Sequence, residues 1–302
     1  MSIETPFTPP MIDGVSASQI YLPNLASIPC SIFAYFCEIF PHISPQEWQQ
    51  RFDHGLIYLD DGKKLTISSC YCAHRTVFYY RFLTHEVPVP FTHEILFENE
   101  HFLVVDKPHF LTISPTGKYV KETLLVRLKQ QSQNEFLTPI HRLDRETAGL
   151  VLFSKQAKTR GLYQNLFAQR QVTKIYHAIA AFQTNLNFPQ TVRLRMEKGN
   201  PFYTMQQVEG VANSETQIAL IEHNHTWAKY LLQPVTGKQH QLRLHLSTLG
   251  IAIRNDPFYP KVQHKADDDF SQPLQLLAKK ISFIDPITQQ HFEFESKQNL
   301  QL

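Results

Sequence analysis

Strand-like segments follow one another from about residue 172 onward, with few helices between them. They fall at about residues 172–182, 214–222, 227–233, 273–284 and 290–295. No helix regularly separates one strand from the next, so the pattern lacks the βαβ alternation of a doubly wound fold. The sequence therefore predicts an α+β fold with a mixed, mainly antiparallel sheet.

Other patterns complete this part of the chain. The segment ILFENEHFLVVDKP holds two strand-like runs around the polar turn Glu98-Asn99-Glu100, which predicts a hairpin. Residues 148–154, AGLVLFS, form a continuous apolar run that is typical of a fully buried strand. Helical patterns cover residues 121–133, 155–170 and 240–250, and the last of these ends on a glycine in the C-cap position.

The N-terminal part divides into two predicted segments. Residues 1–30 carry prolines and turn residues without a period, which indicates an extended arm. Residues 31–84 contain two helical patterns, the second with a Ser44 cap, followed by a hairpin at Asp61-Gly62. We predict that this small α+β module precedes a larger domain over residues 91–302, across a linker containing PVP.

Composition limits the class of protein and its location. The 302 residues are 42% hydrophobic and 19% charged, with a net charge of +2, as in ordinary soluble globular proteins. The N-terminus lacks the pattern of a secretory signal, no apolar run reaches membrane-spanning length, and four cysteines are too few for a disulfide framework. We therefore expect a cytoplasmic protein without a membrane association.

Cys70, Cys72 and His74 raise the question of a metal site. The spacing C-x-C-x-H lacks a second ligand pair at the usual distance, so zinc is the weaker interpretation. The surrounding segment is rich in β-branched and aromatic residues. This favours buried or half-buried thiols on a strand, and we expect no metal.

The segment HRLDRETAG, residues 141–149, is the most informative for chemistry. It leads directly into the predicted buried strand, which would place Asp144 at the strand's rim beside Arg142 and Arg145. Neighbouring guanidinium groups keep a carboxylate ionised, so Asp144 could act as a nucleophile or base near neutral pH. On charge spacing alone, a surface salt-bridge cluster is the more economical interpretation.

Two further segments carry polar side chains at regular spacing. TGKQHQLRLH, residues 236–245, predicts a turn feeding an amphipathic helix on which Arg243 follows His240 by three residues. In the strand pattern VTKIYHAIAAF, period-two alternation places Lys174 and Tyr176 on the same side. Each segment alone fits a solvated basic helix end or an amphipathic strand.

Taken in this order, the three segments resemble the RluA-type pseudouridine synthases. The family's His-Arg-Leu-Asp, Thr-x-Gly and apolar strand are matched by residues 141–153, and the resemblance covers about residues 91–295. It implies the catalytic fold of that family and the isomerisation of specific uridines in structured ribosomal or transfer RNA. It requires neither a metal nor an organic cofactor, implies no protein partner, and leaves a monomer as the default.

The resemblance also assigns roles to residues. Asp144 matches the aspartate that attacks or deprotonates the target nucleotide, Tyr176 the tyrosine that stacks on the base and helps to remove the proton from carbon 5, and Arg243 the basic partner of the aspartate. Arg142 resembles the arginine that fills the gap left by the flipped uridine. The other residues of these motifs are predicted to bind the substrate: His141, Arg145, Lys174, Lys238, His240 and Gln241.

Local charge agrees with an RNA substrate. From His141 to Tyr176 there are seven Lys and Arg residues against two acidic ones, so positive charge gathers around the motifs of a nearly neutral chain. Base flipping costs a few kcal/mol, which basic contacts to the RNA backbone can offset. The helix, Gly55 and hairpin of the N-terminal module also resemble, distantly, the small RNA-binding module that precedes the catalytic domain in many relatives.

Two alternatives follow from the same residues. A non-catalytic RNA-binding or ribosome-assembly factor could keep the cleft, but it should have lost Asp144, Tyr176 or Arg243, and all three are present. A glycoside-type hydrolase normally needs a second carboxylate. Glu146 is the acidic neighbour within the motif, and two residues away in an extended segment we expect it to point away from Asp144.

Overall fold

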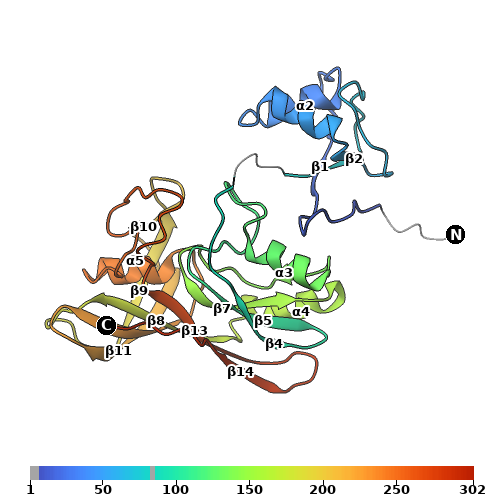
Figure 1. Ribbon diagram of the computed structural model, residues 1–302. Coiled ribbons are helices and arrows are strands. Elements are labelled where there is room, and N and C mark those ends of the chain that lie inside the picture. Colours follow the sequence, from blue (N-terminus) through green and yellow to red (C-terminus); the bar gives the residue numbers. More distant parts are fainter. Residues whose placement is uncertain (1–6, 82–85) are drawn as a thin grey trace. The chain divides into compact units, whose positions relative to one another are not determined.

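The computed structural model describes residues 7–81 and 86–302 (Figure 1). These residues form two compact units. The first combines the described residues up to 86 with residues 116–121 and 126–135, and the second contains residues 87–115, 122–125 and 136–302. The division differs from the predicted one, because two segments expected in the larger domain belong to the first unit. Residues 1–6 of the predicted arm and the module boundary at residues 82–84 lie outside the described residues.

The first unit contains two short helices and a three-stranded antiparallel sheet of order β1-β3-β2. Ser44 and Glu47 form the reciprocal capping box at the start of α2, as the sequence predicts. The turn at Asp61-Gly62 also forms, with the Leu65 amide donating to the Ile57 carbonyl at 2.9 Å, but an isolated bridge between Tyr58 and Lys64 takes the place of the hairpin's second strand. The elements are α1 (Ile32–Ile39), α2 (Pro45–Asp53), β1 (Ser18–Tyr21), β2 (Ile57–Leu59) and β3 (Thr76–Tyr79).

Two expectations for this unit were wrong. Part of the predicted arm is strand β1, which pairs with β3 and is followed by the fully buried Leu22. Four residues are too few to give a clear alternation between neighbouring prolines, so the partner strand decides this element. Cys70 is exposed and Cys72 half-buried, and both precede β3 in irregular chain instead of lying on a strand.

The second unit is built on an 11-stranded mixed sheet, which confirms the predicted fold class. Its main path runs β10-β9-β11-β12-β8-β13-β7-β5-β4, while β14 pairs with β13 and β6 with β7. Among the described strand pairs of this sheet, β7 with β13 is parallel and the others are antiparallel. The strands are β4 (Glu94–Glu98), β5 (Phe102–Lys107), β6 (Thr138–Pro139), β7 (Ala148–Ser154), β8 (Thr173–Ala181), β9 (Gln190–Lys198), β10 (Met205–Val208), β11 (Ser214–His223), β12 (Trp227–Pro234), β13 (Leu276–Ile284) and β14 (His291–Glu295).

In this sheet, strands β6, β9 and β10 are the elements that the sequence pattern did not indicate. In β9, Val192 and Met196 are buried while Arg193 and Arg195 are exposed and bind Glu215 and Glu197. Because charged residues alternate with only a few apolar ones, the segment did not show a clear strand pattern in the sequence. The remaining helices are α3 (Leu124–Ser132), which the two units share, α4 (Ala157–Ala168) and α5 (Gln241–Thr248).

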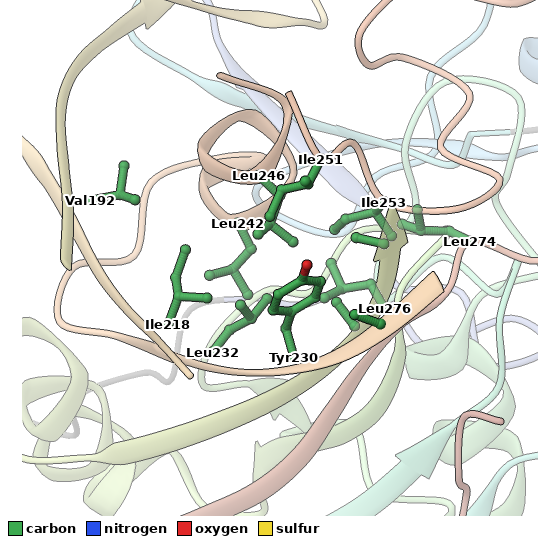
Figure 2. Close-up of a cluster of buried hydrophobic side chains, with 13 residues drawn as sticks. Val192, Ile218, Tyr230, Leu232, Leu242, Leu246, Ile251, Ile253, Leu274 and Leu276 are labelled. Atoms are coloured by element: carbon green, nitrogen blue, oxygen red, sulfur yellow. The ribbon is translucent and has the colours of Figure 1, made fainter. Parts of the chain in front are cut away.

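One core cluster fixes α5 against the sheet. Leu242 and Leu246, one turn apart on α5, pack with Ile218, Tyr230 and Leu232 of strands β11 and β12 (Figure 2). Burying such side chains contributes about 1.5–3 kcal/mol each relative to leaving them exposed. This packing holds the first turn of α5, and with it Arg243, at the end of the sheet where the motif residues meet. No helix among the described residues has the length and apolarity needed to cross a membrane.

Candidate active site

A pocket of about 720 Å³ opens in the second unit where loop 140–147, strand β8 and segment 234–243 converge. The sequence separation of these three segments shows that the sheet assembles the site. Of the ten predicted site residues, Arg145 does not line the pocket. The other nine do: His141, Arg142, Asp144, Lys174, Tyr176, Lys238, His240, Gln241 and Arg243.

Asp144 lies in a turn that leads into β7. The Thr147 amide donates to the Asp144 carbonyl at 3.1 Å, which closes the turn. Gly149 follows at φ +109°, and a Cβ added there would lie 2.3 Å from the Ala278 carbonyl oxygen of β13. Only glycine therefore permits β7 and β13 to approach each other this closely. The approach fixes the start of β7, and with it the turn that carries Asp144.

Arg243 is fully buried and holds the centre of a charge network. Its Nε and Nη2 donate to both carboxylate oxygens of Asp256, at 2.8 and 2.6 Å, and its Nη1 lies 3.4 Å from Asp144 Oδ2. Burial opposes the charged form, but the hydrogen bond and charge of Asp256, with Asp144 and Glu146, keep the pKa of Arg243 above its ordinary value. Asp256 is therefore the main partner, and it leaves Nη1 directed at Asp144.

Glu146 corrects one expectation. Its Oε2 lies 3.8 Å from Arg243 Nη1, so its side chain faces the same guanidinium as Asp144. The expectation assumed an extended segment, whereas residues 144–147 form a turn that brings both carboxylates to the same arginine. Glu146 also contacts Arg145 at 3.5 Å. With Asp256, three acidic side chains thus surround the buried Arg243.

Tyr176 lies on β8 between β12 and β13, and it lines the pocket together with Lys174. The predicted same-side placement of these two side chains is confirmed. Burial and then the charge of Asp144 raise the pKa of Tyr176, so the phenol is protonated at neutral pH. The half-buried ring offers an apolar face and a neutral hydroxyl to any molecule in the pocket.

His240 begins α5 in a left-handed conformation, with φ +52°. Its Nδ1 lies 3.0 Å from the Tyr259 hydroxyl, and its Nε2 lies 3.8 Å from Asp144 Oδ2. Burial lowers the pKa of His240, partly opposed by the charge of Asp144, so the ring is neutral near pH 7. A neutral imidazole beside Asp144 leaves Arg243 as the cation in contact with that carboxylate.

Comparison with known proteins decides the family. The sequence profile described as RNA pseudouridylate synthase matches residues 101–248. The dual-specificity RNA pseudouridine synthase RluA of Pasteurella multocida is 33% identical over 174 residues, which cover 53% of this chain and 73% of that protein. The chain belongs to the RNA pseudouridylate synthase family. It is therefore an isomerase that acts on RNA, and the predicted family is confirmed.

Other relatives and solved structures agree. An uncharacterized RNA pseudouridine synthase of Synechocystis is 28% identical over 232 residues, covering 74% of this chain and 78% of that protein. The structure of human RNA pseudouridylate synthase domain containing 1 superposes with a TM-score of 0.56 at 25% identity, covering 68% of this chain and 84% of that one. The fold of the second unit is thus that of the synthase catalytic domain.

Several of this synthase's predicted substrate-binding residues are held by the protein itself. Gln241 donates to the Glu215 carbonyl and the Thr216 hydroxyl, both at 2.9 Å, and accepts from the Thr236 hydroxyl and the Lys238 amide. With its amide fully engaged, Gln241 shapes the turn at the pocket rim. The prediction that it binds substrate did not include these partners, of which Glu215 and Thr216 lie about 25 residues earlier in the chain on β11.

His141 and Arg145 are also held in place. His141 Nε2 accepts from the Leu152 amide at 3.1 Å, its ring stacks on Phe167, and burial lowers its pKa to about 4. Arg145 lies over the Phe110 ring and donates to the Asp267 carbonyl, outside the pocket lining. Both residues support the loop that carries Asp144, whereas the exposed Arg142 lines the pocket itself.

Three functional residues were not predicted. Asp256 orients Arg243, and Arg170 adds a cation to the pocket lining. The buried Lys107 donates to the carbonyls of Pro108, Leu111 and Arg145, and burial lowers its pKa to about 7. The signal for Lys107 was its place in the segment VVDKP, but its role depends on the loop that the fold brings beside it.

The pocket lining is basic around the carboxylate of Asp144. Its lining includes the side chains of Arg142, Arg170, Lys174 and Lys238. Burial and then the charge of Arg170 lower the pKa of Lys174, which shows how closely the cations crowd. No cluster of three His, Cys, Asp or Glu side chains suited to a metal ion occurs in the part of the chain that the structure describes.

Proposed function

We propose that this synthase isomerises specific uridines in structured ribosomal or transfer RNA, with Asp144 as the catalytic carboxylate. The observation that carries the proposal is the approach of Arg243 Nη1 to Asp144 Oδ2, 3.4 Å, inside a pocket lined by cations. A buried guanidinium favours the ionised carboxylate, which can then attack the sugar or abstract a proton.

The reaction requires the target nucleotide to leave its stack, because the chemistry needs access to both faces of the glycosidic bond. The bond between C1′ and N1 breaks, the uracil turns, and a bond forms between C1′ and C5. The proton on C5 is lost and N1 gains one, so atoms and charge balance. The pocket of about 720 Å³ gives the detached base room to turn beside Asp144.

Tyr176 supports the reaction through its ring. Its raised pKa makes the neutral phenol a poor base at neutral pH, so stacking on the uracil is the role that its environment favours. Lys174, Lys238, Arg142 and Arg170 would bind phosphates on either side of the flipped nucleotide. Arg142, exposed at the rim, is placed to occupy the gap that the flipped base leaves.

Release of tritium from RNA labelled with [5-³H]uridine tests the proposal, because the C5 hydrogen is lost in each turnover. We expect Asp144→Asn to reduce release by at least about 10⁴-fold, while filter binding of the same RNA is retained. Sequencing of pseudouridines in RNA from cells with and without the gene identifies the ribosomal or transfer RNA target. Full activity of Asp144→Asn, or free uracil as product, would refute the proposal.

A further inference from the structure

The turn between β9 and β10 presents an aromatic side chain to solvent close to the pocket. Phe202 is 79% exposed, the most exposed aromatic among the described large hydrophobic residues. Strand β10 contacts α5, the helix that carries Arg243 (Figure 1). Scattered exposed apolar residues need no explanation, but this one stands on an unusually well fixed turn.

Hydrogen bonds within the turn define its shape. The Gly199 amide donates to the Thr204 carbonyl at 3.0 Å, and both the amide and the hydroxyl of Thr204 donate to the Pro201 carbonyl, at 2.8 and 2.7 Å. A Cβ at Gly199 would lie 2.6 Å from the Thr204 hydroxyl oxygen, so the turn is closed around a glycine. The backbone that carries Phe202 is therefore held in one shape instead of forming a loose loop.

The turn is also fastened to the site. Gln239, a pocket residue, donates to the Tyr203 carbonyl at 3.3 Å. The Met205 amide donates to the Tyr259 hydroxyl at 2.7 Å, and the same hydroxyl lies 3.0 Å from Nδ1 of His240. Two independent bonds thus fix the position of the turn relative to the residues around Asp144.

A line of aromatic rings joins Phe202 to the catalytic charge network. Its ring centroid is 5.6 Å from that of Tyr203, which is 5.3 Å from Phe258. The Phe258 ring in turn lies 5.5 Å from the His240 ring and 4.8 Å from the Arg243 guanidinium. An exposed aromatic ring at the outer end of this line offers a surface on which a nucleobase can stack.

We propose that Phe202 is a base-stacking residue that binds a nucleobase of the RNA outside the pocket, close to the flipped uridine. The inference rests on the proposed function, since it assumes that RNA occupies the pocket. Lys198 directly precedes the turn and Lys238 is the neighbour of Gln239, which holds the turn; both are exposed, which favours a polyanion over an apolar protein surface. Fixing the backbone of the turn in advance lowers the entropy lost when a base stacks on Phe202.

Four variants test the proposal: Phe202→Ala, Phe202→Leu, Phe202→Trp and the control Val211→Ala. Val211 is 84% exposed on the segment after β10 and lies outside the pocket lining. The substrate is total RNA labelled with [5-³H]uridine, isolated from cells that lack the synthase. Because both side chains are exposed, melting temperatures should match that of the unmodified protein.

We expect Phe202→Ala and Phe202→Leu to raise the RNA concentration for half-maximal tritium release by about 10-fold or more, with kcat nearly unchanged. Phe202→Trp and Val211→Ala should both keep this RNA concentration at the value of the unmodified protein. Equal behaviour of Phe202→Ala and unmodified protein, or rescue by leucine, overturns the inference.

The proposed function and this inference fail separately. If the unmodified protein releases no tritium, the proposed function is wrong, and filter binding of the same RNA still decides whether Phe202→Ala weakens the complex by about 10-fold. If release is normal in all variants, only the inference about Phe202 is wrong. A change in oligomeric state of Phe202→Ala, seen by light scattering, would assign the ring to contact between copies and would also overturn it.

Discussion

Replacing Asp256 by asparagine should lower both the stability of the second unit and its activity. Arg243 has no exposed surface, and Asp256 accepts two of its N–H groups at 2.8 and 2.6 Å. Asp256 also accepts from the amides of Phe258 and Tyr259, at 2.8 and 3.2 Å. The substitution puts an amide donor where one carboxylate oxygen accepts, and it leaves a buried cation without its main counter-charge.

The expected loss of stability is about 3–5 kcal/mol, the usual cost of removing one partner of a buried ion pair. The activity should fall as well, because Nη1 would turn from Asp144 toward other acceptors. A displacement of about 1 Å at a catalytic group can cost roughly 10²-fold in rate. We therefore expect kcat to fall by about 10²-fold with little change in the RNA concentration needed for half-maximal rate.

Urea-induced unfolding and tritium release measure the two effects on the same preparation. Asp268→Asn, a change of an exposed aspartate, serves as the control and should alter neither quantity. The double variant Arg243→Met with Asp256→Leu should recover much of the stability, because an apolar pair replaces the ion pair, but none of the activity. If Asp256→Asn keeps both its stability and its kcat, the charge network does not orient Arg243 as argued.

Three further predictions concern groups around this network. Burial lowers the pKa of Lys107 to about 7, so the folded state binds that proton less tightly than the unfolded state; stability should rise between about pH 7 and pH 10. Urea unfolding should show that this rise is lost in Lys107→Met. Glu146→Gln should reduce tritium release by about 10-fold, far less than Asp144→Asn, because its contact with Arg243 at 3.8 Å is longer; equal losses would contradict this order. Lys238→Ala should reduce the salt dependence of RNA binding by about one unit of slope, and an unchanged slope in filter binding would place Lys238 away from the phosphates.

Much of the local structure could be predicted from the sequence. The continuous apolar run at residues 148–154 is strand β7 with the same bounds, and the Ser44 capping box starts α2 where expected. Alternation placed Lys174 and Tyr176 on one side of β8, and both line the pocket. These features depend on periodicity and caps, which are determined by residues close to one another in the sequence.

The tertiary structure decided which charges meet. Arg243 and Asp144 are 99 positions apart in sequence, and Arg243 binds Asp256 more closely than it approaches Asp144. Glu146 joins them because a turn, not an extended segment, precedes β7. By itself the sequence determined all five helices of the described residues, most of the strands and the residue types of the site. The partners of each charge were decided only by the sheet, because ion pairs depend on distances between segments that no local pattern records.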